Sequence, residues 1–259
     1  MAEQNQAQTD ITLSVVIITY NEERDIENCL KSVQDIADEI VVLDSFSTDK
    51  TPEICEKYGA KFEQAAFDGY VEQKNNVAQF AGCNYLLSMD ADEVLSDELK
   101  SQIKRLKQNP ESEAYSFNRL TFFCGKPVRH CGWYPDTKIR IWKNGTAVWG
   151  GTNPHDSLIP DKKNRVKHLK GDLLHYSYHS VEQHITQINK FSTIKAEQAL
   201  KKGKNAALPK LIFSPGFKFF RSYFLKLGFL DGFTGYLICK NSAHSTFLKY
   251  AKLRQLYRK

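Results

Sequence analysis

Two aspartates that follow a short apolar run carry the most specific chemistry in this sequence. Asp90 and Asp92 stand two positions apart, directly after Tyr85–Met89. In an extended segment, residues i and i+2 point the same way, so both carboxylates can face one ion. Their hard oxygen ligands suit Mg²⁺ or Mn²⁺, and such a cation lets a diphosphate approach carboxylates and stabilises it as a leaving group. The tripeptide alone is a weak signal, so its position at the end of the run carries the prediction.

Two more apolar runs end in polar residues that could bind a nucleotide. Leu13–Ile18 is followed by Thr19 through Glu22, and Glu39–Leu43 is followed by Asp44 and a Ser/Thr-rich turn. Asp44 could accept a hydrogen bond from a nucleobase imide or a ribose hydroxyl, and Lys74 could reach a phosphate as a point charge. Structural roles are the alternatives, because Asp and Ser cap helices, Asn and Thr form turns, and Lys often lies on a solvated helix face.

The elements that must position these residues alternate over the first 110 residues. Apolar runs predict buried strands at 13–18, 39–43 and 85–89, with a short strand at 60–63. Apolar spacing predicts helices at 26–33, 70–81 and around 99–106, and Thr51 as an N-cap before Pro52 predicts another that Gly59 ends. This rhythm predicts an α/β fold with an open, doubly wound, mostly parallel sheet. Ligands bind beyond the carboxyl ends of such strands, so the three polar ends should meet.

The remainder of the chain has a different pattern. Residues 114–175 contain short strand-like pieces broken by Gly, Pro and Asn, residues 180–202 have a helical pattern, and residues 211–257 are aromatic and basic. We therefore expect a disordered N-terminus over 1–10, an α/β domain over 11–178 and a helical basic and aromatic region over 179–259.

Composition and charge narrow the class of protein. The 259 residues carry a formal net charge of +6, which divides into −9 over residues 1–159 and +15 over residues 160–259. The polar start, the lack of a Cys-x-x-Cys spacing and the absence of a long apolar run predict a cytosolic protein without a membrane span. Neither G-x-G-x-x-G nor G-x-x-x-x-G-K-[ST] occurs, which argues against a dinucleotide enzyme and a P-loop phosphotransferase.

Three strings at the predicted sheet edge resemble the family 2 glycosyltransferases with the GT-A fold. They are Ser14–Glu22, Val41–Asp49 and Leu87–Glu93. Further along, Lys138–Lys143, His155-Asp156 and Gly228–Gly232 resemble the bacterial lipopolysaccharide-core glucosyltransferases of that family. The resemblance implies an inverting transfer of a hexose from a nucleotide-diphosphate sugar such as a UDP-sugar. The expected hexose is glucose.

The resemblance also implies roles for the residues that would bind the donor. Thr19, Glu22 and Asp44 would contact the nucleoside. Asp90 would lie near the ribose and the metal ion, which would be Mg²⁺ or Mn²⁺. Asp92 would bind that ion, and His175 in the string Leu173–Tyr176 would complete its site.

The catalytic base of the family is often a carboxylate in a Glu-Asp or His-Glu pair, and here it would fall on Asp156. The pair reads His-Asp in this sequence, which shortens the side chain that must reach the acceptor hydroxyl. Such a base takes the proton of the attacking hydroxyl on the face opposite the departing diphosphate. Asp136 and Glu93 are alternative bases, and a turn role after Asn153-Pro154 is the structural alternative for Asp156.

The C-terminal region suggests a partner. Residues 205–259 contain ten Lys or Arg, twelve aromatic residues and one acid, Asp231. A segment that docks on an anionic membrane surface fits this composition best, ahead of a basic helical subdomain that packs its aromatics on the core, and well ahead of a nucleic-acid-binding segment. We therefore expect a peripheral enzyme on the cytoplasmic face of the inner membrane, with a lipid-linked or lipopolysaccharide-core acceptor and no nucleic acid. A sugar nucleotidyltransferase and a non-catalytic membrane- or glycan-binding protein are the alternatives.

Overall fold

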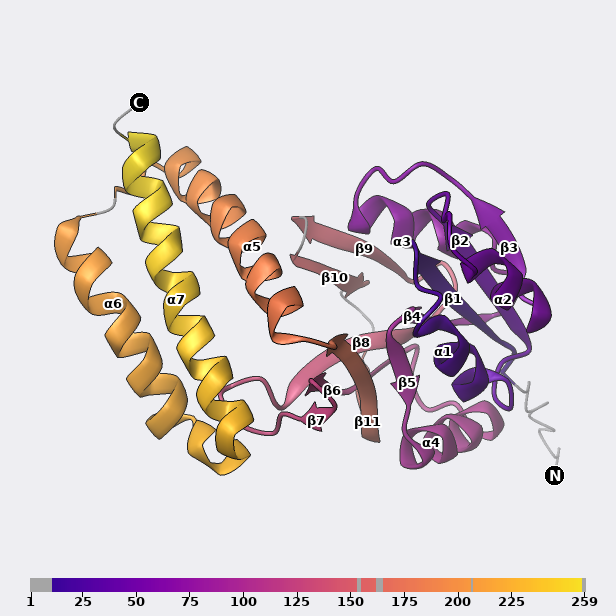
Figure 1. Ribbon diagram of the computed structural model, residues 1–259. Coiled ribbons are helices and arrows are strands. Elements are labelled where there is room, and N and C mark those ends of the chain that lie inside the picture. The colour runs from indigo at the N-terminus through magenta and orange to yellow at the C-terminus, as the bar shows by residue number, and fades with distance from the viewer. Residues whose placement is uncertain (1–10, 153–154, 162–164, 206, 258–259) are drawn as a thin grey trace, which may run out of the picture. The chain divides into compact units, whose positions relative to one another are not determined.

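The computed structural model describes residues 11–152, 155–161, 165–205 and 207–257 (Figure 1). The predicted disorder of residues 1–10 lies outside this range. By its internal contacts the chain divides into two compact units. The first contains residues 1–119 and 136–175, and the second contains residues 120–135 and 176–259. Residues 120–135 belong with the helical unit by these contacts, and the expected boundary after residue 178 stays a prediction.

Four parallel strands form the part of the sheet that the apolar runs predicted. They are β1 (Leu13–Thr19), β2 (Glu39–Asp44), β3 (Lys61–Gln64) and β4 (Tyr85–Asp90). Their order is β3-β2-β1-β4, and all three neighbouring pairs are parallel. The carboxyl ends of these strands therefore lie at one edge of the sheet.

Later strands extend this sheet beyond β4 and add antiparallel pairs to it. The order continues as β8 (Asp136–Lys143), β6 (Ala114–Phe123), β11 (Val166–Tyr178) and β5 (Glu93–Leu95). The pairs β4/β8, β8/β6 and β11/β5 are antiparallel, and the two-residue β7 (Lys126–Pro127) pairs with β6. A separate antiparallel hairpin consists of β9 (Ala147–Thr152) and β10 (His155–Pro160). The strand-like pieces of residues 114–175 are thus strands, arranged around a parallel centre.

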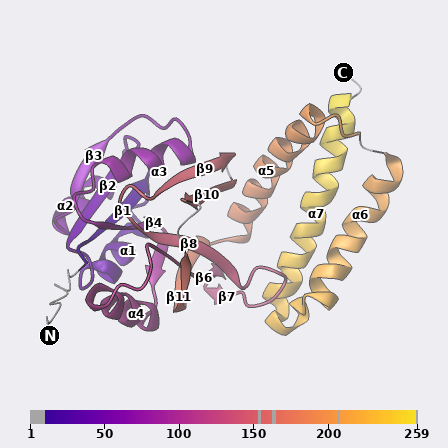
Figure 2. The ribbon, with the colours of Figure 1, turned by 180° about the vertical axis from the view of Figure 1, so that it is seen from behind.

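Apolar side chains of the strands form two cores, one on each face of the sheet. Val15 and Ile17 belong to one core and Val16 to the other, as the two-residue period of a strand requires. The first core includes side chains of α1 (Ile26–Val33), α2 (Thr51–Lys57) and α4 (Asp97–Gln108), and the second includes α3 (Tyr70–Gln79). Figure 2 shows the same helices from behind. The prediction of a doubly wound α/β fold is confirmed.

One predicted cap is wrong. Thr51 is the first residue of α2, and Lys50 stands at the N-cap position. The hydroxyl oxygen of Thr51 accepts a hydrogen bond of 2.8 Å from the backbone N–H of Glu22, so this side chain ties together two loops at the sheet edge. Gly59, with a φ of +68°, follows the helix as predicted.

The second unit is mainly helical. It contains α5 (Val181–Lys201), α6 (Leu208–Phe220), a π-helical turn over Arg221–Leu225, a 3₁₀ turn over Gly228–Asp231 and α7 (Gly232–Tyr257). Both α5 and α6 pack against α7. Within the described part of the chain, each helix is too short or too polar to cross a bilayer.

The string Gly228–Gly232 has a structural role within this unit. Asp231 accepts a 2.8 Å hydrogen bond from the backbone N–H of His130 and lies 2.7 Å from Nδ1 of the same residue. A Cβ atom on Gly235 would lie 1.9 Å from the carbonyl oxygen of Gly228. These two glycines therefore allow the 3₁₀ turn to pack directly on the start of α7.

We expect Gly235→Ala to destabilise the protein by about 3 kcal/mol, because the added methyl group overlaps backbone that cannot move alone. Gly216→Ala is the matched control, since a Cβ there meets nothing within 4 Å and alanine favours a helix by about 0.5–1 kcal/mol. Urea unfolding of the three proteins measures both effects. Equal midpoints for Gly235→Ala and the wild type would show that the close approach is absent.

Candidate active site

Three of the predicted site residues end adjacent strands. Thr19 lies opposite Asp44 in the β1/β2 register, and Ile18, its neighbour, lies opposite Asp90 in β1/β4. The parallel pairing therefore brings the polar ends of β1, β2 and β4 to the same edge, as the sequence predicted.

The loops after β1 and β2 are bonded to each other. The backbone N–H of Asn21 donates to Oγ of Ser47 at 2.7 Å, and the backbone N–H of Thr48 donates to Oδ1 of Asn21 at 2.8 Å. Asn21 has a φ of +54°, a left-handed conformation that asparagine tolerates better than most residues. These bonds hold Glu22 next to the acidic end of β4.

Asp44 organises its own loop. The residue is fully buried, and its carboxylate accepts hydrogen bonds from the backbone N–H and the hydroxyl of Ser47 and from Nε2 of Gln64. Its predicted contact with a nucleoside stays a prediction. Thr19 is also buried, but its hydroxyl oxygen has no hydrogen-bond partner among the described residues. A bound ligand could supply that missing partner.

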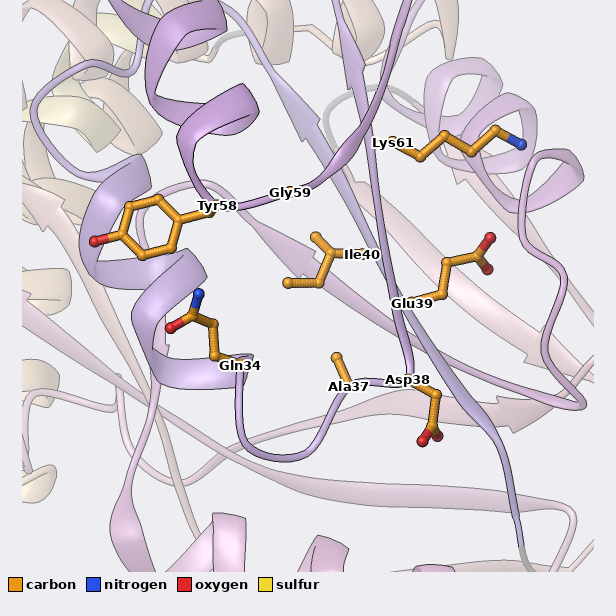
Figure 3. Close-up of a pocket in the computed structure, with 8 residues that line it drawn as sticks. All are labelled: Gln34, Ala37, Asp38, Glu39, Ile40, Tyr58, Gly59 and Lys61. Carbon is orange, nitrogen blue, oxygen red and sulfur yellow. The ribbon is translucent and has the colours of Figure 1, made fainter.

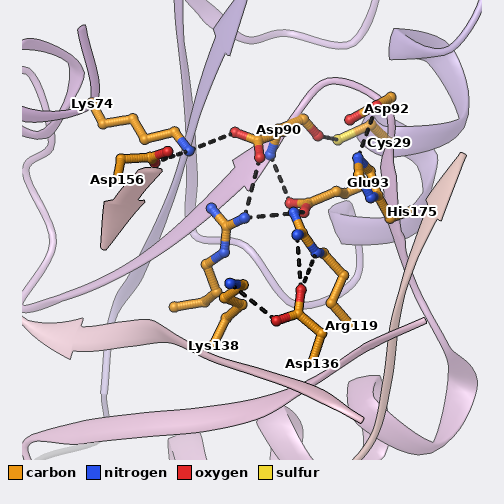
Figure 4. Close-up of polar contacts among 11 residues, drawn as sticks. Cys29, Lys74, Asp90, Asp92, Glu93, Arg119, Asp136, Lys138, Asp156 and His175 are labelled. Atoms are coloured by element: carbon orange, nitrogen blue, oxygen red, sulfur yellow. Dashed lines mark hydrogen bonds and ion pairs between the residues drawn. The ribbon is translucent and has the colours of Figure 1, made fainter. Parts of the chain in front are cut away.

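A buried lysine joins Asp90 to the predicted catalytic base. Nζ of Lys74 lies 3.0 Å from Oδ1 of Asp90 and 2.8 Å from Oδ2 of Asp156, as Figure 4 shows. The Lys74 side chain is only 5% exposed, so the solvated helix face that the sequence allowed is wrong. Burial alone would raise the pKa of Asp90, but the charges of Lys74 and Arg140 outweigh it and hold that pKa well below its usual range. Asp90 and Asp156 are therefore each paired with a cationic side chain of the protein.

Helix α3 and the β9/β10 hairpin hold Lys74 in this place. Nδ2 of Asn75 donates to the carbonyl oxygen of Trp149 at 2.9 Å, and the backbone N–H of Trp149 donates to Oδ1 of Asn75 at 2.9 Å. The same tryptophan lies under the lysine, with Nζ 4.5 Å from the ring centroid. Asp156 pairs with Gly151 in the hairpin register, so one arrangement fixes the lysine and the carboxylate together.

Arg140 is a site residue that the sequence reasoning missed. This arginine is buried on β8, and its Nη2 lies 3.1 Å from Oδ2 of Asp90 and 3.0 Å from Oε1 of Glu93. Its Nε and Nη1 have no hydrogen-bond partner among the described residues, and neither has Nε1 of Trp149. The available signal was a charged residue within the apolar string Ile139–Trp142, because a buried charge needs a partner.

The two alternative bases differ in accessibility. Glu93 is fully buried, accepts a 2.8 Å hydrogen bond from the backbone N–H of Asp90 and faces Arg140, so it is not open to an acceptor. The Asp136 side chain is 30% exposed and is paired with Arg119 at 2.8 Å and with Lys138 at 3.0 Å. Asp136 resembles Asp156 in being a cation-paired, partly exposed carboxylate.

Two of the three predicted metal ligands, Asp92 and His175, contact each other. The third, Asp90, is paired with Lys74 and Arg140 instead. Nε2 of His175 lies 3.1 Å from Oδ2 of Asp92, and this carboxylate raises the pKa of His175 against the effect of burial. Burial, and then the charge of Asp92, raise the pKa of Glu22 to about 7. Among the described residues, no three His, Cys, Asp or Glu side chains are arranged to hold a metal ion. Carboxylate and imidazole are nevertheless donors that Mn²⁺ accepts, and a cation would relieve the repulsion at Glu22.

A separate groove lies at the opposite end of the parallel strands. Its volume is about 520 Å³, and Figure 3 shows its lining: Gln34, Ala37, Asp38, Glu39, Ile40, Tyr58, Gly59 and Lys61. Asp38 accepts a hydrogen bond from the backbone N–H of Leu13, and Glu39 accepts one from that of Gly82. These carboxylates hold strand starts in place, so this groove is not the candidate site.

Comparison with known proteins identifies a family and several relatives of this chain. The model of glycosyl transferase family 2 matches residues 14–157. An uncharacterized glycosyltransferase of Rickettsia bellii is 33% identical over 254 residues, which cover 94% of this chain and 86% of that protein. The lipopolysaccharide core biosynthesis glycosyltransferase LpsC of Rhizobium meliloti is 28% identical and covers 95% of this chain and 93% of its own length. The crystal structure of S. aureus TarS 1–349 with UDP-GlcNAc is 14% identical, covers 96% of this chain and 92% of that chain, and has a TM-score of 0.47. By the family match and the identity to the R. bellii protein, the chain belongs to glycosyl transferase family 2.

Proposed function

We propose that this glycosyltransferase moves a hexose, glucose in the first instance, from a UDP-sugar to a glycan acceptor with inversion, and that Asp156 is the general base. The observation that carries the proposal is the Lys74 bridge, which joins Asp156 to the acidic end of β4. Asp156 lies 66 positions from Asp90 in the sequence, yet one lysine contacts both. A base beside the donor's reacting carbon needs that proximity.

The donor would lie across the carboxyl ends of β1, β2 and β4. Thr19, Glu22 and Asp44 would contact the nucleoside, and the partnerless hydroxyl of Thr19 supports this placement. Lys74 would contact a phosphate oxygen of the donor. Because an ammonium group has three N–H donors, Lys74 can keep its ion pair with one carboxylate while it also binds a phosphate oxygen.

Metal dependence is part of the proposal. Asp92 and His175 would hold Mg²⁺ or Mn²⁺, with Asp90 near the ion and the ribose. When bound, the cation would offset the charge of the departing diphosphate. Both oxygens of Asp90 face protein cations, so Asp92 and His175 fit a direct ligand role better than Asp90 does.

The chemistry at Asp156 is a single displacement. The acceptor hydroxyl oxygen forms a bond to the anomeric carbon while the bond from that carbon to the diphosphate breaks. The hydroxyl proton passes to the Asp156 carboxylate, and the bonding electrons leave with the nucleoside diphosphate. Lys74 pairs with Asp156 in the free protein, so this carboxylate oxygen must leave the ion pair to accept the proton; a donor phosphate that takes up the lysine would release it.

The acceptor would be a lipid-linked or lipopolysaccharide-core glycan at an anionic membrane surface, on the cytoplasmic face of the inner membrane. The name of the R. meliloti relative and the charge of +15 over residues 160–259 support this assignment. Such an acceptor is anionic, and a basic surface favours its approach.

Thermal unfolding with nucleotides tests the donor and the metal together. We expect UDP to raise the melting temperature only when Mn²⁺ is present, and Asp92→Asn to abolish that rise, because a ligand of the folded state stabilises it. Asp97→Asn, which changes a fully exposed carboxylate, is the control and should behave as the wild type.

Three other outcomes would contradict the proposal in part or as a whole. An equal response of Asp92→Asn and the wild type would refute the metal assignment. Release of pyrophosphate from a nucleoside triphosphate and a sugar phosphate would indicate a nucleotidyltransferase. Nucleotide binding without turnover of any sugar donor would indicate a binding protein.

A further inference from the structure

Helix α6 lies at the surface of its unit. None of its residues is buried, although it packs against α7. Four of its large apolar side chains face outward: Ile212, Phe213, Phe217 and Phe220 are 59%, 72%, 62% and 50% exposed. An exposed apolar surface of this kind indicates a site of contact.

The apolar surface continues through the turns that join α6 to α7 and onto the first residues of α7. Phe224, Leu225, Leu230 and Phe233 are 49%, 63%, 57% and 75% exposed. Figure 1 shows that these turns close one end of the α6–α7 pair. We call these four residues, with Ile212, Phe213, Phe217 and Phe220, the docking surface.

Basic side chains accompany the docking surface. Those of α6, the following turns and the start of α7 are exposed: Lys210, Lys218, Arg221, Lys226 and Lys240. The one acid in this stretch, Asp231, is bonded to His130 and the backbone beside it. A groove of about 370 Å³ between α6 and α7 adds apolar lining from Leu211, Pro215 and Phe247 with Lys240 at its side. The stretch therefore presents apolar groups together with uncompensated positive charge.

We propose that α6 and the turns after it dock the protein on an anionic phospholipid bilayer, with α6 lying in the plane of the interface. This inference rests on the membrane role in the proposed function and assigns it to particular residues. Phenylalanine and leucine enter the boundary between headgroups and acyl chains, while lysine and arginine pair with the phosphates. Contact in the plane of the interface fits a helix whose apolar and basic side chains are both exposed along its length.

The same features disfavour the other occupants. A second copy of this chain would bring the same five basic side chains against themselves, which charge repulsion opposes. A single-stranded nucleic acid would use stacking aromatics, but three of the eight residues of the docking surface are aliphatic and cannot stack on a base.

Vesicle sedimentation with the full chain tests the proposal. We expect the wild type to sediment with phosphatidylglycerol-containing vesicles and not with phosphatidylcholine alone, and to be released by salt. The double variant Phe213→Ser/Phe217→Ser should bind the anionic vesicles at least about tenfold more weakly. Ile185→Ser, at a 47% exposed apolar residue of α5 outside the docking surface, is the matched control and should bind as the wild type.

A charge variant and an oligomer measurement complete the test. Lys218→Gln/Arg221→Gln should weaken binding to anionic vesicles without affecting the melting temperature. Equal vesicle binding by the wild type and the phenylalanine variant would overturn the proposal. So would a dimer in solution that the phenylalanine variant loses, if the wild type does not bind vesicles.

The nucleotide response separates this inference from the proposed function. Since the docking surface lies outside the nucleotide-binding edge, UDP with Mn²⁺ should stabilise the phenylalanine variant as it does the wild type. Loss of vesicle binding with a retained nucleotide response supports the docking surface. A wild type that responds to nucleotide but ignores vesicles refutes the docking surface and leaves the transferase proposal intact.

Discussion

Replacing Asp156 with asparagine is expected to lower kcat for sugar transfer by a factor of about 10²–10⁴, which is the contribution of a general base. Asparagine keeps the size of the side chain and its oxygen near Lys74, but it cannot take the proton of the acceptor hydroxyl. The affinity for the nucleotide should change little, because the nucleotide contacts other residues. Initial rates at saturating donor and acceptor, together with titration of UDP, measure the two quantities separately.

Asp136→Asn is the matched control for this variant. Asp136 is also a partly exposed carboxylate, and it is paired with the side chains of Arg119 and Lys138. Loss of its charge therefore imposes a comparable structural change. We expect its kcat to stay close to that of the wild type. If Asp136→Asn loses turnover while Asp156→Asn keeps it, the base is Asp136 and the assignment from the His-Asp pair fails.

The parallel centre of the sheet could be predicted because its signals are local. Leu13–Ile18 is apolar at every position except Ser14, which only a strand buried on both faces explains, and the structure divides its side chains between two cores. Once three such runs alternate with helices in a parallel sheet, the strand ends must share an edge. The closeness of Thr19, Asp44 and Asp90 follows from topology alone.

The partners of the charged residues could not be predicted, because they come from distant parts of the chain. Lys74 contacts Asp156, 82 positions away, and Arg140 contacts Asp90, 50 positions away. Helical periodicity gives the face on which a lysine lies, but not which strand covers that face. The burial of Lys74 depends on Trp149 and the β9/β10 hairpin, whose position no local pattern determines.

The second unit shows the same limit. Residues 120–135 belong with the helices because Asp231 binds His130, 101 positions away, and Cys131 packs near Ile238 and Cys239. In the sequence these residues look like a continuation of the strand region. The sequence shows the aromatic and basic composition of residues 205–259. Only the structure shows which phenylalanines of α6 are exposed and which residues of α7 are packed.

Replacing Lys74 with methionine is expected to lower kcat/KM for the donor about 100-fold and to destabilise the fold by about 2 kcal/mol. The stability loss follows because Asp90 and Asp156 would keep their charges near one another without the ammonium group between them. It stays below the cost for a fully buried pair, because the two carboxylate side chains are 27% and 16% exposed. Urea unfolding measures this loss, and Lys138→Met, which removes a 37% exposed lysine paired with Asp136, should lose less than half as much.

Comparing UDP with uridine distinguishes a phosphate contact of Lys74 from a purely structural role. If Lys74 binds a donor phosphate, Lys74→Met should lower the affinity for UDP about 100-fold and leave the affinity for uridine nearly unchanged, because uridine has no phosphate that could contact Lys74. If the lysine only holds Asp90 and Asp156 in place, both ligands should weaken by the same factor, since the variant would disturb the nucleoside-binding edge itself. Because Lys74 contacts both Asp90 and Asp156, this ratio of affinities decides whether the donor can release the base from its ion pair.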